Sequence, residues 1–160
     1  MTTRRRKKTR KRKLKKPVNS IKRVFDGIEF DSTPEMDMYI LLKKAGIKFA
    51  YTGKSKGAYV LFSEGKYLSE CYERARKNSP KMRDFSKING MSYTPDFIGE
   101  NHEWIIEVKG RKIGDFNMRW KLFKHHLNKS DNPPILFMPT NTQDMEQVIT
   151  ILKSKGYATK

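Results

Sequence analysis

Apolar side chains recur at helical spacing in three parts of the chain, within residues 33–45, 116–127 and 145–156. The first segment has the clearest ends. Ser32 precedes it and can cap its free N–H groups, and Gly46 follows where helices commonly end. The spacing therefore predicts three amphipathic helices.

Short apolar runs between turn residues predict strands at 24–30, 49–51, 59–62, 92–98, 104–109 and 135–138. The pair Asp26-Gly27 divides the first run and is typical of a tight hairpin. Residues 99–103 form a polar turn between two further strands, and the spacing within 67–75 predicts a fourth helix. Because helices and strands are interspersed, we expect an α/β (α+β) fold with a mixed sheet flanked by helices.

Basic residues concentrate at the N-terminus. The chain has 35 Lys and Arg against 17 Asp and Glu, a net charge of +18, and thirteen of the basic residues lie within residues 1–23, which hold no acid. Residues 1–20 have too few apolar side chains to offset the entropy of ordering. We therefore predict a disordered arm there that binds nucleic acid through its phosphates. Residues 21–160 then form one domain, with an insertion at about 47–91.

Simple counts exclude several classes of protein. The single cysteine, Cys71, rules out a disulfide framework and a cysteine-rich zinc site. No run approaches the roughly 20 apolar residues of a membrane span, and no signal-peptide core follows the basic N-terminus. We expect a cytoplasmic protein with a nucleic-acid partner and no membrane partner.

Three charged residues lie in or beside two of the predicted strands. Glu107 and Lys109 are two residues apart, so on a strand they share one face, and the segment around them is apolar. Burying such groups costs free energy unless they serve a ligand or each other. Asp96 lies on the preceding strand, where it could bring a second carboxylate toward Glu107. Two carboxylates with a backbone carbonyl and water suit Mg²⁺.

The order Pro95-Asp96, ten residues, Glu107-Val108-Lys109 resembles the PD-(D/E)XK nuclease superfamily. The resemblance covers roughly residues 24–140 in element order. The segment 109–123 looks like that of small phage-encoded members, some of which are Holliday-junction resolvases of the endonuclease I type. It implies a restriction-endonuclease-like core, a central mixed four-stranded sheet between helices, and Mg²⁺-dependent hydrolysis of DNA phosphodiesters, with Mn²⁺ able to substitute.

The resemblance also implies roles for individual residues. Asp96, Glu107 and the Val108 carbonyl would be metal ligands, Lys109 the catalytic lysine, and Glu35 an auxiliary acid and further metal ligand. Nucleic-acid contacts are expected from the basic arm and from residues in and before the helix at 116–127: Arg4, Arg5, Arg6, Lys7, Lys8, Arg10, Lys11, Arg12, Lys13, Arg111, Lys112, Arg119, Lys121 and Lys124. Lys121 is the favoured phosphate contact of that helix.

Alternative interpretations stay open at this stage. The pair Glu107 and Lys109 could be an ion pair on a solvated sheet face, and a capping box alone would explain Glu35. The rival function is a non-catalytic nucleic-acid-binding protein, with a virion or packaging role, on a nuclease-like fold. RNA is as compatible with the charge as DNA, and a homodimer is allowed.

Overall fold

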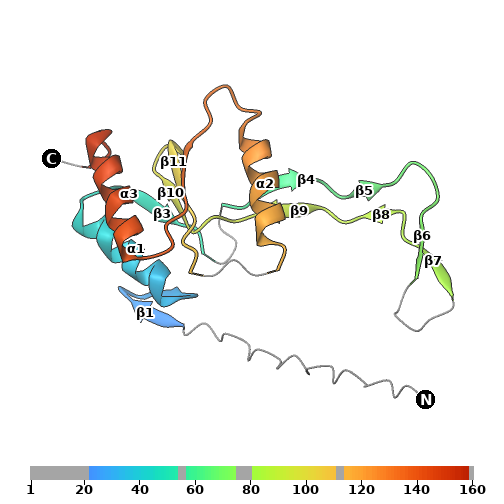
Figure 1. Cartoon of the computed structure of the whole chain (residues 1–160), viewed down its shortest axis with the longest axis horizontal. Coiled ribbons are helices and arrows are strands. Elements are labelled where there is room, and N and C mark those ends of the chain that lie inside the picture. The colour runs from blue at the N-terminus through green and yellow to red at the C-terminus, as the bar shows by residue number, and fades with distance from the viewer. Residues whose placement is uncertain (1–21, 54–56, 75–80, 111–113, 159–160) are drawn as a thin grey trace, which may run out of the picture.

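The computed structural model describes residues 22–53, 57–74, 81–110 and 114–158 (Figure 1). Within them the elements follow in the order β1 (Arg23–Phe25), β2 (Ile28–Phe30), α1 (Thr33–Lys44), β3 (Phe49–Tyr51), β4 (Tyr59–Phe62), β5 (Gly65–Lys66), β6 (Tyr72–Arg74), β7 (Met82–Asp84), β8 (Lys87–Ile88), β9 (Met91–Tyr93), β10 (Phe97–Gly99), β11 (Trp104–Ile106), α2 (Phe116–Leu127), β12 (Ile135–Phe137) and α3 (Thr142–Ser154). The expected arm at residues 1–20 lies outside the described residues.

A four-stranded mixed sheet lies at the centre, with strand order β12-β11-β10-β3. Strand β10 pairs antiparallel with β11 and with β3, and β11 pairs parallel with β12. The apolar strand β11 is therefore internal, as expected for a run with no polar face. The predicted mixed sheet flanked by helices is confirmed, in an α+β arrangement.

Alternation along β11 divides the core into two layers. Trp104 and Ile106 are buried against α1 and α3, whereas Ile105 is buried against α2 on the opposite face. Successive side chains of a strand point to opposite faces, so residue 107 is expected on the α2 side. One strand thus contributes to both layers, and Glu107, which follows it, lies beside Phe116 and Arg119 of α2.

The predicted helix starts and turns are confirmed where the local signals were strong. Ser32 has extended backbone geometry and its side chain accepts a hydrogen bond from the Glu35 N–H, so it caps α1. Asp26 and Gly27 both have positive φ, 55° and 73°, between the paired strands β1 and β2. Both angles suit the tight hairpin turn that an Asp-Gly pair favours.

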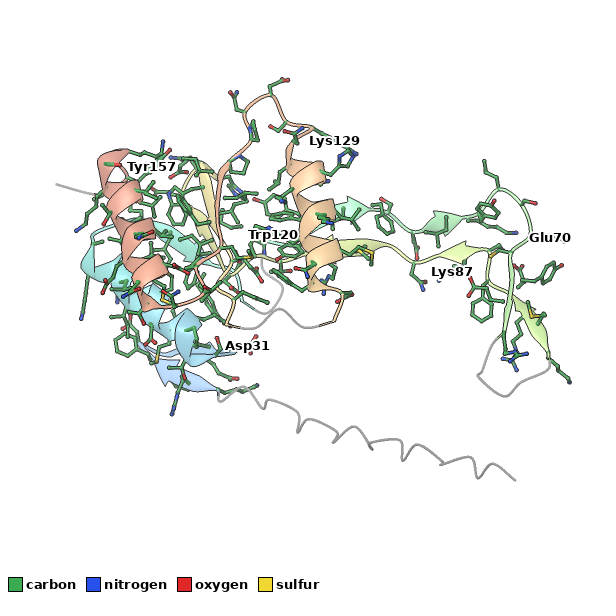
Figure 2. The ribbon with its side chains drawn as sticks, viewed as in Figure 1. Asp31, Glu70, Lys87, Trp120, Lys129 and Tyr157 are labelled. Atoms are coloured by element: carbon green, nitrogen blue, oxygen red, sulfur yellow. The ribbon has the colours of Figure 1, made fainter. Side chains whose placement is uncertain are left out.

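The helix predicted within residues 67–75 is wrong. This part of the insertion forms one half of a two-stranded antiparallel ribbon, made by the pairs β4–β9, β5–β8 and β6–β7 (Figure 1). Its side chains, including Tyr67 and Leu68, are largely exposed (Figure 2). An amphipathic helix would need an apolar surface to pack against, and the described chain offers none there. The segment therefore forms backbone hydrogen bonds with a second strand instead of a helix.

The prediction of one continuous strand at 92–98 is also wrong, because the structure has two strands there. Strand β9 ends at Tyr93 and pairs with β4 in the ribbon, while β10 starts at Phe97 in the central sheet. Pro95 lies at the break, and a proline cannot donate to a strand ladder. The chain therefore leaves one sheet and enters another immediately before β10, at Asp96.

Candidate functional site

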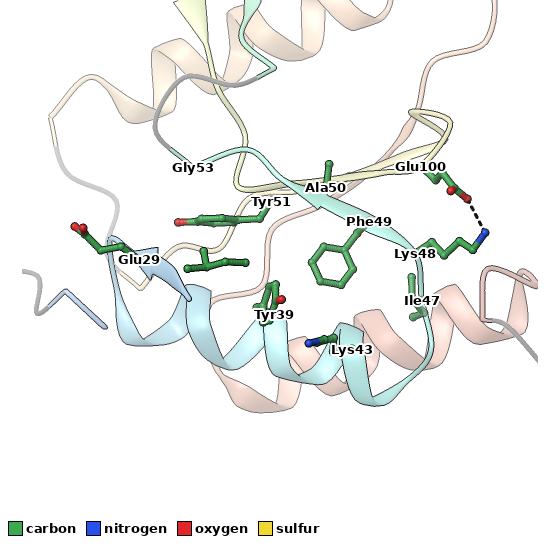
Figure 3. Close-up of a pocket in the computed structure, with 11 residues that line it drawn as sticks. Glu29, Tyr39, Lys43, Ile47, Lys48, Phe49, Ala50, Tyr51, Gly53 and Glu100 are labelled. Atoms are coloured by element: carbon green, nitrogen blue, oxygen red, sulfur yellow. Dashed lines mark ion pairs between the residues drawn. The ribbon is translucent and has the colours of Figure 1, made fainter. Parts of the chain in front are cut away.

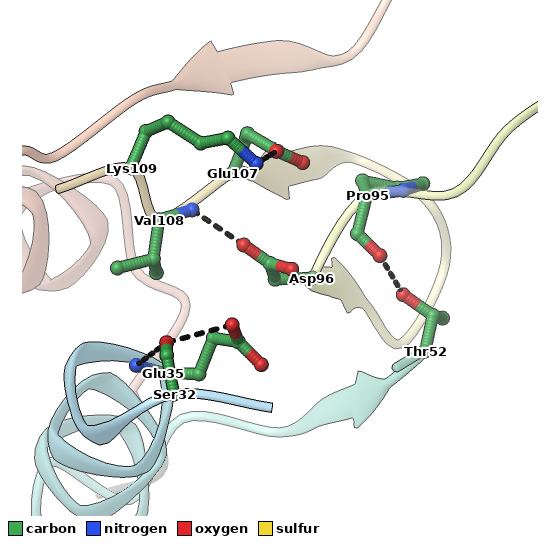
Figure 4. Close-up of polar contacts among 8 residues, drawn as sticks. All are labelled: Ser32, Glu35, Thr52, Pro95, Asp96, Glu107, Val108 and Lys109. Carbon is green, nitrogen blue, oxygen red and sulfur yellow. Dashed lines mark hydrogen bonds and ion pairs between the residues drawn. The ribbon is translucent and has the colours of Figure 1, made fainter. Parts of the chain in front are cut away.

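Asp96 occupies the point where β10 begins beside the end of β11. Its N–H donates to the Ile106 carbonyl at 3.2 Å, and its Oδ2 accepts from the Val108 N–H at 2.6 Å (Figure 4). The Val108 N–H thus donates to the Asp96 side chain instead of to a backbone carbonyl of the neighbouring strand. This contact fixes the Asp96 carboxylate at the end of the two central strands.

The chain around Asp96 is also held from β3. The Thr52 hydroxyl donates to the Pro95 carbonyl, and the Thr52 N–H donates to the Asp96 carbonyl at 3.0 Å (Figure 4). Thr52 itself is buried. Both backbone carbonyls of the strand break are therefore satisfied, so the break is a defined feature of the fold.

Residues 107–109 continue from β11 alongside the end of β12 and the chain that follows it. The Glu107 N–H donates to Phe137 and the Lys109 N–H to Pro139, each at 3.0 Å. Val108, between them, turns its N–H toward Asp96 instead. In an extended chain one residue's N–H and C=O face the same neighbour, so the Val108 carbonyl also lies on the Asp96 side.

Glu107 and Lys109 form a partly buried ion pair. Lys109 Nζ lies 2.9 Å from Glu107 Oε1, and their side chains are 33% and 5% exposed respectively. The other oxygen, Glu107 Oε2, is buried without a hydrogen-bond partner. The first alternative for this pair, a solvated surface ion pair, does not fit these exposures, and the Tyr93 hydroxyl lies beside the same carboxylate.

The carboxylates of Asp96 and Glu107 disfavour each other's charge. Burial raises the pKa of Asp96 well above its usual value, and the nearby charges of Glu107 and Glu35 raise it further. Burial likewise raises the pKa of Glu107, although Lys109 opposes that rise. A cation bound beside the two carboxyl groups would favour the ionised form of both.

Glu35 brings a third carboxyl toward the same place from α1. It is only 9% exposed, and Figure 4 shows it on the opposite side of Asp96 from the Glu107–Lys109 pair. Its Oε1 accepts from the Ser32 hydroxyl at 2.7 Å and its Oε2 from the Tyr51 hydroxyl at 2.9 Å. Both oxygens are therefore already bonded, so its capping role and its auxiliary role are both compatible with the geometry.

A pocket of about 410 Å³ opens beside Glu107 and Lys109. Helix α2 supplies Phe116 and Arg119 to its wall, with Asp115 just before the helix, and the strand break supplies Tyr93 and Thr94. Of these five residues, only Arg119 was predicted from the sequence. Tyr93 precedes Pro95-Asp96 by only two residues, and that proximity was the one available signal.

The remaining basic residues of the prediction divide into two groups. Lys121 and Lys124 are exposed on α2 and do not line the pocket. Outside the described residues are Arg4, Arg5, Arg6, Lys7, Lys8, Arg10, Lys11, Arg12, Lys13, Arg111 and Lys112. Their contacts with nucleic acid stay a prediction.

The chemistry of the donor set fits a hard divalent cation. Glu107 Oε2 is an orphaned buried acceptor, and Asp96 adds a second carboxylate beside the Val108 backbone. Among the described residues no three or more His, Cys, Asp or Glu side chains come together as a metal cluster. Two carboxylates and a backbone carbonyl are oxygen ligands of the kind that Mg²⁺ takes, with water completing its coordination.

A larger pocket, about 870 Å³, lies along the edge strand β3 (Figure 3). Tyr39 and Phe49 contribute aromatic rings to it, and an ion pair between Lys48 and Glu100, 3.4 Å apart, closes one side. None of Asp96, Glu107 and Lys109 lines it. Its size therefore does not make it the candidate site, because it lacks the reactive groups.

A family model matches most of the chain. The model of a family described as "Protein of unknown function (DUF1064)" matches residues 15–138. No curated protein and no solved structure is similar to the chain. Within the described residues, no helix is both long enough and apolar enough to span a membrane.

Proposed function

The chain belongs to the DUF1064 family, and since that family has no assigned function, we propose from the geometry of the site that the protein is a metal-dependent nuclease. The proposal specifies a Mg²⁺-dependent DNA endonuclease of the PD-(D/E)XK type, with a restriction-endonuclease-like core and a structure-specific preference for branched DNA. A phage origin and a cytoplasmic location belong to the same proposal.

One observation supports the proposal most directly. Asp96, Glu107 and Lys109 meet at the end of the two central strands, and two of these groups are carboxylates with raised pKa values. A fold retains an arrangement that is unfavourable by itself when it serves a ligand. A divalent cation is the ligand that relieves both charges.

The residues divide the chemistry of phosphodiester hydrolysis between them. Asp96 and Glu107, with the Val108 carbonyl, would hold Mg²⁺, which supplies Lewis acidity toward a phosphate oxygen. Lys109 remains attached to Glu107 Oε1, so its ammonium group is fixed at the pocket. From there it can stabilise the negative charge that develops on the phosphoryl oxygens or orient the attacking water.

The experiment is cleavage of supercoiled plasmid, a four-way DNA junction and a single-stranded RNA, each with Mg²⁺ and with a chelator. We expect nicked and linear products that carry 5′-phosphates, formed only with the metal. Asp96→Ala and Glu107→Ala are the controls, because each removes one carboxylate of the site. Cleavage that survives both substitutions would overturn the proposal, and preference for the RNA would reassign its substrate.

The rival function is supported by a different observation, the basic N-terminal segment. A non-catalytic binding protein would bind DNA in the absence of metal, with strong salt dependence, and would cut no strand. Removal of residues 1–17 separates the two functions. The truncation should abolish most affinity of a pure binding protein, whereas in a nuclease it should raise KM and preserve single-turnover cleavage.

We propose that the chain forms a homodimer and that the ribbon formed by β4 to β9 is its interface. Its described residues expose eight large apolar side chains: Val60, Phe62, Tyr67, Leu68, Tyr72, Met82, Phe85 and Ile88. At about 200 Å² per large side chain and half exposure, they present roughly 800 Å², which is about what each partner buries in a stable complex. Residues 59–93 hold seven basic and four acidic side chains, so the exposed apolar area, and not the charge, is the argument for a second copy.

Charged substitutions on the ribbon test this dimer. We expect the full chain to sediment as a dimer at high salt, and Leu68→Glu with Tyr72→Glu to raise the dimer Kd at least about tenfold, because both side chains would be buried between copies. Ile151→Glu on α3 is the control, since Ile151 is an exposed apolar residue outside the ribbon. A monomeric wild-type chain at about 100 µM would contradict the proposal.

A further inference from the structure

Tyr93 is the most unusual polar residue of the pocket beside the acids. It is only 4% exposed and lines the pocket, and its buried hydroxyl makes no hydrogen bond of regular geometry, although the neighbouring Glu107 carboxylate can accept from it. A buried hydroxyl without a regular hydrogen bond costs free energy that a single substitution would remove, because phenylalanine has the same shape without the oxygen. The hydroxyl therefore needs an explanation other than packing.

The ring of Tyr93 is held firmly in place. It stacks on Phe123, with ring centroids 4.4 Å apart and an angle of 16° between the planes. The Arg119 guanidinium lies over the same ring at 5.8 Å, and Arg119 also donates to the Ser92 carbonyl at 3.3 Å. The hydroxyl is thus a rigidly placed donor, and a cation is fixed next to it.

Charges around the pocket favour an anionic ligand on this side. Lys109 and Arg119 both line it, and Lys109 lies 4.8 Å from the centre of the Phe116 ring. A phenol hydroxyl carries its proton at neutral pH, so the Tyr93 hydroxyl can donate to an anion in the pocket. The acids Glu107 and Asp115 also line the pocket, and a phosphate beside Glu107 requires a cation between them.

We propose that Tyr93 and Arg119 form a phosphate-binding subsite next to the Asp96–Glu107 carboxylates, in which the Tyr93 hydroxyl donates to a phosphate oxygen of a nucleotide. This inference rests on the proposed function, because the subsite adjoins the same metal-binding acids. It makes Tyr93 a binding residue for the substrate backbone. The subsite recognises phosphate, so it carries no base specificity.

The test measures binding separately from cleavage. Deoxythymidine 3′,5′-bisphosphate is titrated into the full chain at saturating Ca²⁺, a cation that also prefers oxygen ligands, and its Kd is obtained by calorimetry. We expect Tyr93→Phe and Arg119→Gln each to raise that Kd about tenfold or more, since each removes a hydrogen bond to a charged group. With a DNA substrate, Tyr93→Phe should raise KM more than it lowers kcat.

Tyr59→Phe is the matched control. The Tyr59 ring also packs on Phe123, at 5.2 Å, but its hydroxyl lies beside His102 Nδ1, outside the pocket. The Kd of Tyr59→Phe for the bisphosphate should equal that of the wild type. Thermal unfolding of Tyr93→Phe should show unchanged or higher stability, which excludes a folding defect as the cause of weaker binding.

The outcomes separate the subsite from the nuclease. Loss of bisphosphate affinity in Tyr93→Phe without any detectable cleavage by the wild type would support the subsite and overturn the nuclease. Cleavage with unchanged Kd and KM in Tyr93→Phe would overturn the subsite alone. Weaker Ca²⁺ binding with unchanged bisphosphate affinity at saturating Ca²⁺ would also overturn it, because Tyr93 would then only position Glu107.

Discussion

Asp96→Asn and Glu107→Gln are each expected to lower the cleavage rate by at least about 10²-fold while making the metal-free protein more stable at pH 8. Each substitution removes one negative charge that would hold the cation. The amide keeps the size of the side chain, and in Asp96→Asn it keeps an oxygen that can accept from the Val108 N–H. Lost activity and gained stability in one variant are the signature of a group retained for its chemistry.

The gain in stability follows from the direction in which folding moves the pKa values. Folding raises the pKa of both carboxyls, chiefly by burial. At a pH between the pKa of the unfolded state and the pKa of the folded state, each carboxyl therefore binds more protons in the folded state. Stability of the wild type should therefore fall as pH rises from about 4, the unfolded value, through the raised folded values. A carboxyl whose pKa is higher by one in the folded state lowers stability by about 1.4 kcal/mol at a pH above both values.

Thermal unfolding in chelator from pH 4 to pH 8 measures this effect. The two variants should lose less stability than the wild type over that range, and Mg²⁺ should stabilise the wild type but not the variants. Asp144→Asn gives the opposite control, because hydrogen bonds from Thr140 and Asn141 lower the pKa of the exposed Asp144. Its substitution should reduce stability at neutral pH. Carboxylate variants less stable than the wild type at pH 8 would contradict the interpretation.

Local signals were sufficient for the elements that lie near the site. Ser32 and Gly46 delimited α1 because caps act through the nearest backbone groups, and the apolar run from Trp104 predicted an internal strand because no polar face interrupted it. The prediction that the Glu107 and Lys109 side chains share one face followed from the alternation of side chains along a strand alone. These features depend on neighbours in sequence, so a sequence can show them.

Other features depend on distant neighbours and were missed. The ribbon took the place of a predicted helix because nothing in the described chain covers Tyr67 or Leu68, and sequence spacing does not reveal the absence of a cover. The pocket joins Tyr93 to Arg119, 26 residues later, through packing on α2. The lack of a regular hydrogen bond at the Tyr93 hydroxyl is visible only when all its neighbours are placed.

Lys109→Met is expected to lower cleavage by about 10²-fold or more and, unlike the acid variants, to reduce stability by about 1 kcal/mol. The methionine keeps the apolar contact with Phe116 but leaves the buried Glu107 carboxylate without its ion-pair partner. Burial and the nearby Glu35 would then oppose the charge of Glu107 without compensation from the lysine, so the pKa of Glu107 should rise further. Loss of the amine also removes the positive charge that faces the phosphate.

The double variant Lys109→Met/Glu107→Gln tests whether the stability lost in Lys109→Met comes from the unpaired Glu107 carboxylate. Its stability should return to that of the wild type or exceed it, because no unpaired charge remains, while cleavage stays at the level of the single variants. Lys48→Met is the matched control, since Lys48 pairs with Glu100 on the surface, where an ion pair contributes little. Cleavage restored in the double variant would contradict the roles of both residues, because Glu107 would then not be needed as a metal ligand either.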